Sequence, residues 1–536
     1  MLSLLSPLYL ETIVSEARFP TASWPPANVT LQSNLPRNAN PLQESFIRLE
    51  EAETLRQQKK LDRAQKICES LLRSHPDYMA ALHTLGLIYA DKENYQRAFD
   101  CLARAAMINP RSWSTLTALS GVYLELDAPE MAAQALEQAK ALKPNDPSIL
   151  VTLGEIYRKE REYEFAKDAY RQALNVEPGL EPAASGLGWV CSYIGEYAEA
   201  AEIFEKLIDR KALSLSVLSA LSSLPSAFVK TDILAELGKV ARSETEDKAA
   251  TDNAIAFMRA IALDKMGRHR EAWEAFVPAN RTMFAAMRDE YRQDTERESV
   301  NLATLQGNVV KPAGDTNEAG RTISLFILGP SRSGKTTLEQ LVGNLAGVKC
   351  GYENPGVELA VKRTFQTAGL LTTDFFELLP PQLYPLCREI YLEQLTRRAG
   401  SANVFTNTHP LRILDAPLIA TVFPNVRFLF VKRDVDDTVL RIYQRKYREG
   451  NAYSYDLGAT RKHVLWYHQM MDTLAKKLPD HVRIIDYKDM VADPARAVRT
   501  AAELCGVEAR HGPLPVLRDD SGCAQHYREY IDSPTI

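Results

Sequence analysis

Hydrophobic and small residues return at a fixed interval along the first half of the chain. Between about residues 44 and 211 the same pattern recurs about five times with a step of 34 residues, as from Pro76 to Pro110. A period of this length predicts a stack of similar supersecondary units rather than one globular core. The series are Pro76, Pro110, Pro144 and Pro178; Leu85, Leu119, Leu153 and Leu187; Ala98, Ala132, Ala166 and Ala200; and Tyr89, Tyr123 and Tyr157, with Cys191 in the fourth place.

The pattern resembles the tetratricopeptide repeat, in which a small residue lies where two helices cross and a proline closes each unit. The resemblance implies one helical hairpin per unit. Because a hairpin cannot bury its apolar face alone, neighbouring units are expected to stack into a superhelix with a concave groove. We predict an all-α solenoid over residues 44–300, in which 253–283 is a degenerate hairpin. Such a groove usually binds a protein or peptide, and a structural spacer is the alternative.

Two segments without periodicity flank this solenoid. Residues 1–43 are rich in Pro, Asn and Ser, so we predict a flexible N-terminal leader. In 301–320 the helical period is lost and Gly, Pro, Asn and Asp gather, which indicates a linker. The chain is therefore expected to contain at least two domains, as its 536 residues also suggest.

Short apolar runs alternate with helical stretches in residues 321–536. This alternation predicts an α/β domain of the P-loop type, with a parallel sheet, helices on both faces and a ligand site at the carboxyl ends of the strands. The expected strands are 325–328, 404–405, 427–432 and 482–485, and the expected helices are 336–345, 372–398, 436–448, 457–477 and 494–505.

The first of these strands leads into a glycine loop and then a helix. Gly329 and Gly334 bracket the loop, and with Lys335 and Thr336 they match the spacing of a phosphate-binding loop. In this arrangement backbone N–H groups and a helix N-terminus converge on an anion. Arg332 and Lys335 add positive charge, so we predict a phosphate or sulfate site here.

Composition limits the remaining possibilities. The net charge of −5 gives no general attraction to nucleic acid or to an anionic membrane. The seven cysteines form no Cys-x-x-Cys pair, which argues for reduced thiols and against a zinc site. No apolar run reaches the length of a membrane span, and a cytoplasmic protein is expected.

A phosphate-binding loop by itself suggests an enzyme that uses ATP or GTP with Mg²⁺. That ion would need the loop threonine and an aspartate at the end of a neighbouring strand. The strand at 427–432 is followed by Arg433 and then Asp434, and the strand at 482–485 by Asp486. An aspartate is thus available, but an arginine at the end of the more apolar strand suits a second anion better.

Several separated segments resemble the bacterial enzymes that join tetratricopeptide repeats to a sulfotransferase domain. They cover nearly all of 323–508, in the same order. The segments are 329–336 with Glu339 and Gln340 following, 423–438, 451–457 and 482–494.

The resemblance implies transfer of a sulfuryl group from 3′-phosphoadenosine-5′-phosphosulfate to a hydroxyl or amine, with no metal required. The loop N–H groups, including that of Gly334, would hold the 5′-phosphosulfate together with the hydroxyls of Ser333, Thr336 and Thr337. Arg332 and Lys335 would neutralise the charge that builds on the bridging oxygen, and Arg433 would hold the 3′-phosphate.

The acceptor must lose a proton, and the resemblance offers two candidate bases. Glu353 stands shortly after the loop helix, and His409 stands in the segment Asn407-Thr-His409. The alternatives are that Glu353 is a surface carboxylate and that His409 is a hydrogen-bonded turn residue. Together with Lys335, these residues form the predicted catalytic set.

The chain departs from the family pattern at several positions. Lys335 replaces the usual threonine, Asn407 replaces a lysine, and Arg441 replaces a serine. No Arg-Lys-Gly loop is evident near the C-terminus. Arg441 may be read as compensating on a helical face shared with Arg445 and Arg448, or as part of a solvated basic helix. A kinase or NTPase using ATP and Mg²⁺, and a non-catalytic repeat scaffold, therefore stay open.

Overall fold

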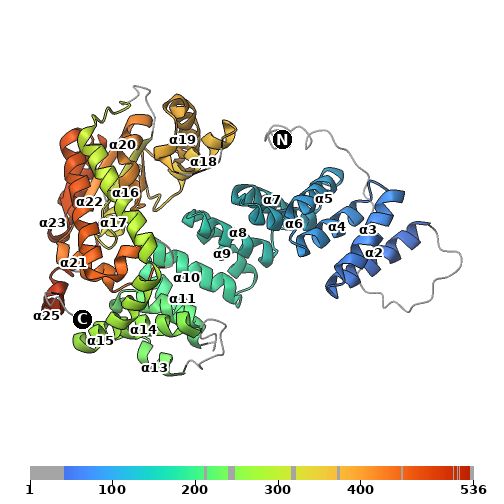
Figure 1. Ribbon diagram of the computed structural model, residues 1–536, viewed down its shortest axis with the longest axis horizontal. Helices are drawn as coiled ribbons and strands as arrows, with labels where there is room; N and C mark the ends of the chain where they lie inside the picture. The colour runs from blue at the N-terminus through green and yellow to red at the C-terminus, as the bar shows by residue number, and fades with distance from the viewer. Residues whose placement is uncertain are drawn as a thin grey trace. The chain divides into compact units, whose positions relative to one another are not determined.

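The chain forms two compact units in the computed structural model (Figure 1). The first unit holds residues up to Ile156 with Asn175–Pro178, and the second holds Tyr157–Leu174 and the chain from Gly179 onward. We predicted the division at 301–320, but the contacts group the later repeat helices with the α/β domain. The structure describes residues 41–209, 214–239, 248–314, 322–370, 373, 375–447, 451–510, 512–515, 517 and 519–531.

The predicted leader and linker are only partly covered by the structure. Residues 1–40 lie outside the described part, and helix α2 begins at Pro41. Helix α16 (Arg288–Gly307) runs into the segment predicted as a linker, so residues 301–307 are helical. The reason is Leu305, which is 2% exposed and packs into the core of the α/β domain. Residues 315–320 lie outside the described part.

The first unit is a run of helical hairpins, as the repeat pattern predicted. Gly86 on α4 packs so closely against α5 that a Cβ there would lie 2.6 Å from Cγ of Leu102. The repeated alanines Ala98 and Ala132 are fully buried. The tetratricopeptide hairpins are thus confirmed. The helices are α2 (Pro41–Gln57), α3 (Leu61–Ser74), α4 (Met79–Asp91), α5 (Tyr95–Ile108), α6 (Trp113–Glu125), α7 (Pro129–Leu142) and most of α8 (Pro147–Lys159).

Each hairpin turns through one residue in the left-handed backbone conformation. These residues recur every 34 positions, and their φ angles lie between +54° and +83°. A left-handed residue ends a helix by redirecting the chain while its N–H bonds back to the last turn. The first three belong to the first unit and the last two to the second. The five are Lys59, Glu93, Asp127, Arg161 and Gly195.

The second unit begins with further helices. The degenerate hairpin predicted at 253–283 corresponds to α14 and α15, where the rings of Phe257 and Phe276 meet edge-on at 6.2 Å. The helices before the sheet are α9 (Tyr163–Val176), α10 (Glu181–Ile194), α11 (Tyr197–Asp209), α12 (Leu215–Ser223), α13 (Ile233–Lys239), α14 (Lys248–Lys265), α15 (His269–Ala286) and α16.

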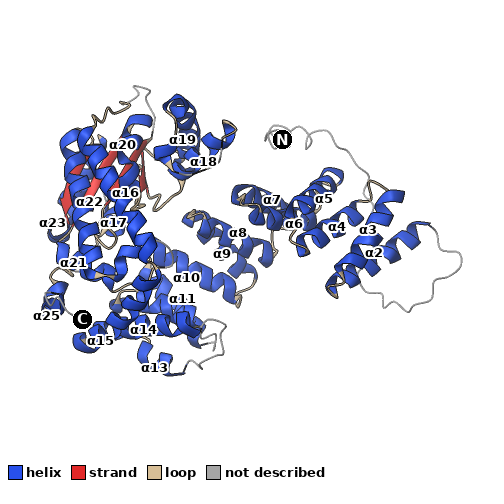
Figure 2. Ribbon diagram, viewed as in Figure 1, coloured by secondary structure: helices blue, strands red, loops and turns tan. Residues whose placement is uncertain are grey.

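The α/β domain contains a five-stranded parallel sheet with the order β2-β3-β1-β4-β5. Figure 2 shows its strands in red among the helices of this domain. The central strand β1 pairs with β3 on one side and β4 on the other, so that Leu325 lies opposite Thr406 and Arg427. The predicted parallel α/β architecture is confirmed. The strands are β1 (Ile323–Leu328), β2 (Val348–Lys349), β3 (Val404–Asn407), β4 (Val426–Lys432) and β5 (Val482–Asp486).

Helices cover both faces of this sheet because the side chains of β1 alternate between them. Phe326 and Leu328 enter one core, and Leu325 and Ile327 enter the other, as the period of two in a strand requires. The first core is completed by α18 (Gly356–Thr367), α19 (Tyr384–Ala399), α20 (Arg412–Val422) and α22 (Leu457–Lys477). The second is completed by α17 (Lys335–Val342), α23 (Tyr487–Ala492) and α24 (Pro494–Cys505).

Helix predictions in this domain succeeded where no proline or polar break intervened. The stretches 457–477 and 494–505 are helices α22 and α24. The stretch 372–398 was wrong in its first half, because Pro380 and Pro381 leave only short 3-10 turns before α19 begins at Tyr384. Helices α18 and α20 were not predicted.

The helices α14–α16 pack directly against the α/β domain within the second unit. Asn280 of α15 donates from Nδ2 to the carbonyl oxygen of Tyr443 at 3.2 Å. Glu298 of α16 accepts from Nε1 of Trp466 through its carbonyl oxygen at 2.7 Å and pairs with His463 through its carboxylate at 2.5 Å. Among the described helices, none has both the length and the apolar character needed to cross a bilayer.

Candidate functional site

The glycine loop lies where the strand order changes direction. Because β1 has β3 on one side and β4 on the other, the connections that leave these strands diverge at the carboxyl ends and open a crevice. Residues 329–334 leave β1 at this point and enter α17, which begins at Lys335. The free N–H groups at the start of α17 therefore face the edge of the sheet where ligands bind in such folds.

Close neighbours leave no room for a side chain at either glycine of the loop. A Cβ on Gly329 would lie 2.7 Å from the carbonyl oxygen of Val431 on β4, so no side chain fits. Gly334 has φ +103°, and a Cβ there would meet the ring of Tyr487 at 2.7 Å. Arg332 between them also has a positive φ, +63°. The loop thus passes close to β4 and α23, with its backbone rather than side chains at the contacts.

Lys335 supplies a buried positive charge within this loop. Its Nζ donates a hydrogen bond to the carbonyl oxygen of Pro330 at 2.9 Å. Burial lowers the pKa of Lys335 to about 8; the nearby Glu353 carboxylate acts against this shift, and the charge of Arg332 adds to it. The ammonium group therefore stays mostly protonated at pH 7.

Ser333 offers an unused hydrogen-bonding group in the same loop. Its side chain is fully buried, and Oγ has no hydrogen-bond partner within the described part of the chain. A buried hydroxyl without a partner costs free energy, which an oxygen of a bound phosphate or sulfate would recover. Thr336 and Thr337 follow in the first turn of α17 and are half-buried. The predicted anion-binding residues of the loop thus lie together.

The two candidate bases come from the loops that follow β2 and β3. Glu353 is half-buried, and His409 is 5% exposed. The two loops are joined by a hydrogen bond from the backbone N–H of Thr408 to the carbonyl oxygen of Tyr352 at 2.7 Å. The charge of Lys335 acts on both candidates, and the loops that carry them leave the same edge of the parallel sheet as the glycine loop.

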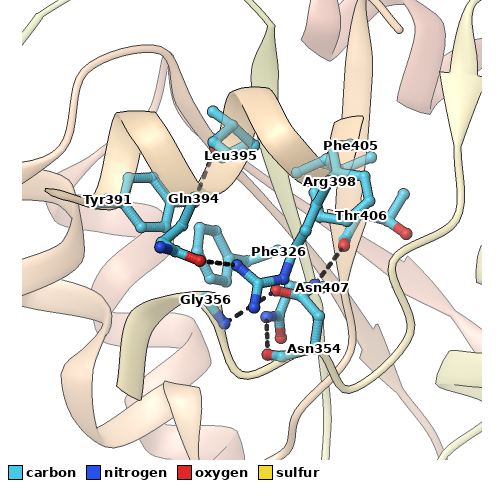
Figure 3. A pocket seen from close by; sticks show the side chains of 12 residues that line it. Phe326, Asn354, Gly356, Tyr391, Gln394, Leu395, Arg398, Phe405, Thr406 and Asn407 are labelled. Atoms are coloured by element: carbon cyan, nitrogen blue, oxygen red, sulfur yellow. Dashed lines mark hydrogen bonds between the residues drawn. The ribbon is translucent and has the colours of Figure 1, made fainter. Parts of the chain in front are cut away.

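Asn354 fixes the loop that carries Glu353 to strand β3 (Figure 3). Its Nδ2 donates to the carbonyl oxygen of Thr406 at 3.0 Å, and its Oδ1 accepts from the N–H of Gly356 at 3.2 Å. In turn, Nδ2 of Asn407 donates a hydrogen bond to the carbonyl oxygen of Asn354 at 2.9 Å. Asn407 stands where the family resemblance leads to a lysine, and here its amide holds the neighbouring loop.

His409 is kept neutral by its surroundings. Burial, followed by the positive charges of Arg161, Arg412 and Lys335, lowers the pKa of His409 well below its usual value. Its Nδ1 has no hydrogen-bond partner among the residues that the structure describes. A buried ring near three cations is unfavourable for an added proton.

Glu339 is a buried neighbour of the site that was quoted in the sequence only as part of a motif. Its Oε1 accepts hydrogen bonds from the N–H of Tyr352 at 2.9 Å and from Oγ1 of Thr406. Burial raises the pKa of Glu339 to about 7. Glu339 therefore ties helix α17 to the loop of Glu353. Its place on the helix was readable from the sequence, but its burial was not.

The turn of the fourth repeat also reaches the site. Arg161 pairs through Nη1 with Oε1 of Glu358 at 3.3 Å, and Arg412 pairs with the same oxygen at 3.4 Å. The ring of Tyr163 contacts that of Tyr352 edge-on at 6.3 Å. Residues of the repeat region thus stand beside the loop of Glu353, which the sequence pattern alone did not indicate.

The turn of the fifth repeat contacts the loop helix itself. Gln340 of α17 donates from Nε2 to the carbonyl oxygen of Ile194 at 2.8 Å. A Cβ on Gly195 would overlap the same amide group, so a larger residue at this turn would displace the Gln340 side chain. Two successive repeat turns are therefore packed against the α/β domain.

Arg433 stands at the carboxyl end of β4, as predicted, and meets a carboxylate there. Its guanidinium lies 4.2 Å from the ring centre of Tyr487 and is 5% exposed. Nη2 donates to the carbonyl oxygen and to Oδ1 of Asp520 at 2.9 and 3.0 Å. Arg441 pairs with Oδ2 of the same residue at 3.3 Å. The two predicted phosphate-binding arginines thus converge on one point.

The basic helical face predicted around Arg441 is not present as such. Helix α21 (Val435–Tyr443) ends before Arg445, so Arg441 and Arg445 do not share it, and Arg448 lies outside the described residues. Arg445 instead donates from Nη2 to the carbonyl oxygen of Ser223 at 2.9 Å, at the end of α12. The free carbonyl groups of that helix end attract the cation.

The aspartates at the strand ends serve as helix caps. Asp434 accepts from the N–H of Asp437 at 3.0 Å at the start of α21. Asp486 accepts from the N–H of Lys488 at 2.8 Å at the start of α23. A magnesium site beside the loop would need one of these carboxylates as a ligand, and both already satisfy helix N-termini.

One group of side chains elsewhere in the described chain has the spacing of a metal site. Cys191, Glu196 and Glu199 bring their ligand atoms within 4.8 Å of one another. Glu196 pairs with Lys167 at 2.6 Å and Glu199 with Arg171 at 2.8 Å, so both carboxylates are already neutralised. Burial raises the pKa of the Cys191 thiol to about 12, which keeps it protonated.

Comparison with known families divides the chain in two. Residues 324–511 match the model of a family described as the sulfotransferase family. Residues 80–112 and 147–179 match one model of the tetratricopeptide repeat, and residues 183–215 match another. The matched ranges contain the glycine loop, both candidate bases and Arg433.

Individual relatives are distant and are covered in part. An uncharacterized protein of Aquifex aeolicus (strain VF5) is 22% identical over 59% of this chain and 42% of its own length. Protein-tyrosine sulfotransferase 1 of Danio rerio is 23% identical over 33% of this chain and 51% of its own. The chain thus spans about half the length of these relatives, or less. The solved structure of YrrB, described as a tetratricopeptide protein with an unusual peptide-binding site, is 23% identical, with 33% of this chain and 91% of that chain covered and a TM-score of 0.31.

Proposed function

Since the chain joins tetratricopeptide repeats to a sulfotransferase-family domain at 324–511, we propose that it transfers a sulfuryl group from 3′-phosphoadenosine-5′-phosphosulfate to a hydroxyl group of a protein or peptide. The observation that supports the proposal is that Lys335, Glu353 and His409 follow β1, β2 and β3, whose carboxyl ends share one edge of the parallel sheet. These residues come from three loops at one edge of the sheet.

The residues around the loop fit the donor. The 5′-phosphosulfate would be held by the loop N–H groups and by the hydroxyls of Ser333, Thr336 and Thr337, and the orphan Oγ of Ser333 supports this assignment. The 3′-phosphate would be held by Arg433, whose Nε is buried without a partner in the described chain. When bound, the donor supplies an activated sulfuryl group.

The removal of the acceptor's proton and the neutralisation of the leaving group's charge can then be assigned to residues of this chain. Glu353 takes the proton of the acceptor hydroxyl as the new S–O bond forms. The S–O bond to the 5′-phosphate breaks, and Lys335 and Arg332 neutralise the charge left on its oxygen. His409 remains neutral throughout and can hold the acceptor oxygen by a hydrogen bond. Every step uses charge and hydrogen bonds from side chains near the loop.

We propose tyrosine as the acceptor side chain. One relative is named as a protein-tyrosine sulfotransferase, and an aromatic ring of the repeats contacts Tyr352, the neighbour of Glu353 in the chain. Tyr163 contacts Tyr352 edge-on, Tyr193 stacks on Tyr163 at 5.4 Å, and Trp189 stacks on Tyr193 at 5.9 Å. Aromatic rings favour stacked or edge-on contact with another ring, which suits a phenol.

The test is a binding and transfer experiment on the full chain. Calorimetric titration with 3′,5′-adenosine bisphosphate is expected to show binding that is lost in Arg433→Ala. Transfer of labelled sulfate to tyrosine peptides is expected to persist in EDTA. Magnesium-dependent ATP binding with no response to the bisphosphate would instead favour a kinase or NTPase. An absence of binding to both nucleotides would leave a scaffold, with the repeats as the working part.

A further inference from the structure

The C-terminal segment places a carboxylate on the arginine pair proposed to bind the 3′-phosphate. Oδ1 of Asp520 accepts from Nη2 of Arg433 at 3.0 Å and from Oη of Tyr487 at 2.5 Å. Oδ2 lies 3.3 Å from Nη2 of Arg441. A carboxylate held by two guanidinium groups resembles a phosphate held by the same groups, since both are compact anions that accept several donors.

Asp520 differs in its hydrogen-bond partners from four nearby carboxylates, those of Asp434, Asp437, Asp486 and Asp519. Asp434 and Asp486 cap helices, as described above. Asp437 accepts from the N–H groups of Gly522 at 2.6 Å and Ala524 at 2.9 Å. Asp519 accepts from the N–H of Ser521 at 2.9 Å. These carboxylates accept hydrogen bonds from backbone N–H groups, whereas Asp520 pairs with the side chains of Arg433 and Arg441.

The segment that carries Asp520 is anchored at its far end. Oη of Tyr527 donates to Oδ1 of Asp264 on α14 at 2.5 Å, and the ring of His526 stacks on that of His269 at 4.6 Å. Asp437 fixes the turn between these contacts and Asp520. The carboxylate is therefore delivered to the arginines at a high local concentration, as any tethered ligand is.

We propose that Asp520 is an internal competitor of the donor's 3′-phosphate and so sets the affinity and selectivity of the nucleotide site. The inference rests on the proposed function, since it assumes that Arg433 receives a 3′-phosphate. Binding of that phosphate requires Arg433 and Arg441 to exchange one anion for another. The orphan Nε of Arg433, which Asp520 does not reach, is then available to the larger phosphate group.

The test compares nucleotides with and without the 3′-phosphate. Binding of 3′,5′-adenosine bisphosphate and of 5′-AMP is measured by calorimetry for the full chain and for Asp520→Asn, which keeps the size of the side chain. We expect Asp520→Asn to bind the bisphosphate about 10-fold more tightly or better, with 5′-AMP changed less than about 2-fold. Asp519→Asn is the matched control, because this carboxylate feels the charge of Arg433 but its hydrogen bond is to the N–H of Ser521, and it should change bisphosphate binding clearly less than Asp520→Asn.

The outcomes separate this inference from the proposed function. Unchanged or weaker bisphosphate binding in both Asp520→Asn and Asp520→Ala would overturn the inference, since Asp520 would then position Arg433 rather than compete for it. Such a result leaves the sulfotransferase proposal intact if the unaltered chain binds the bisphosphate. If no protein binds it, the proposed function and the inference fall together. The melting temperature of each variant verifies that the fold is retained.

Discussion

Glu339 links proton binding at the candidate site to the stability of the fold. Its pKa is about 7 in the structure, against a usual 4.5, because burial disfavours the charged carboxylate. The folded state therefore binds a proton that the unfolded state releases. The stability that this group contributes is present below pH 4.5 and is lost as the pH rises through 7.

We expect Glu339→Gln to flatten this pH dependence. A shift from 4.5 to about 7 corresponds to about 3 kcal/mol in the free energy of unfolding. Urea unfolding at pH 5 and pH 8 should therefore show a larger loss of stability for the unaltered chain than for the variant, which carries no ionisable group there. Equal losses for both proteins would show that Glu339 is not the titrating group.

Glu353 is expected to act on the rate of transfer and not on donor binding. Glu353→Gln removes the base, and we expect kcat to fall by about 10²-fold or more. The affinity for 3′,5′-adenosine bisphosphate should stay within about 2-fold, since Arg433 and the loop are untouched. Glu393→Gln on the exposed side of α19 serves as the control. A variant Glu353→Gln with full kcat would move the role of base to another residue.

At the residue scale, the sequence identified side chains by motif but not by burial. Lys335, Glu353 and His409 were selected because the glycine loop and the family segments give them positions in the sequence, and their roles stay predictions. Glu339 and Asp520 were not given roles, since each gains its importance from a partner far away in the chain. Asp520 lies 87 residues from Arg433, and no local pattern relates the two.

At the scale of elements, the turn of the fourth repeat is held to helix α19 by a buried ion pair. Glu162 pairs with Arg398 at 2.5 Å and accepts a hydrogen bond from its Nε at 2.8 Å. The Arg398 side chain is 3% exposed, and its other partner is Oε1 of Gln394 at 2.6 Å. Loss of one member of a buried pair leaves an uncompensated charge.

We expect Glu162→Ala to lower the free energy of unfolding of the second unit by about 3 kcal/mol. The matched control is Glu199→Ala, which breaks a more exposed pair with Arg171. That variant should cost no more than about 1 kcal/mol. Both are measured by thermal and urea unfolding of the full chain. Equal losses of stability in the two variants would mean that the buried Glu162–Arg398 pair stabilises the fold no more than the exposed Glu199–Arg171 pair does.

Element prediction worked where one physical signal dominated. The period of 34 residues fixed the repeat helices, and unbroken apolar periodicity fixed α22 and α24. Strand β2 has two residues, too few for any pattern. Its place depends on pairing with β3, which brings together residues 56 positions apart, such as Val348 and Val404. Pairing between residues so far apart is visible only in the folded chain, so the sequence alone could not predict this strand.

For the whole molecule, the contacts group the chain from Tyr157 onward, apart from Asn175–Pro178, with the α/β domain. A fragment that begins at residue 321 would lose the partners of Trp466, His463 and the core contact of Leu305. We expect this fragment to be poorly soluble or to melt at a much lower temperature. A fragment of residues 157–536 is expected to bind 3′,5′-adenosine bisphosphate as the full chain does.

The two fragments are compared by circular dichroism melting and by calorimetry. A fragment 321–536 with the melting temperature and ligand affinity of the longer one would contradict the packing argument. The sequence placed the boundary at the loss of helical period, which is where one architecture ends. Folding follows buried contacts instead, and these join α9–α16 to the sheet.

The left-handed turn residues recur every 34 positions along the repeats. The fourth and fifth turns, at Arg161 and Gly195, contact the α/β domain. The first three turns, at Lys59, Glu93 and Asp127, belong to the other unit. We therefore expect that whole 34-residue modules ahead of the fourth turn can be added or removed without altering the contacts of Arg161 and Gly195 with the α/β domain. The length of the first unit can in this way vary, in evolution or by design, independently of the residues around the glycine loop.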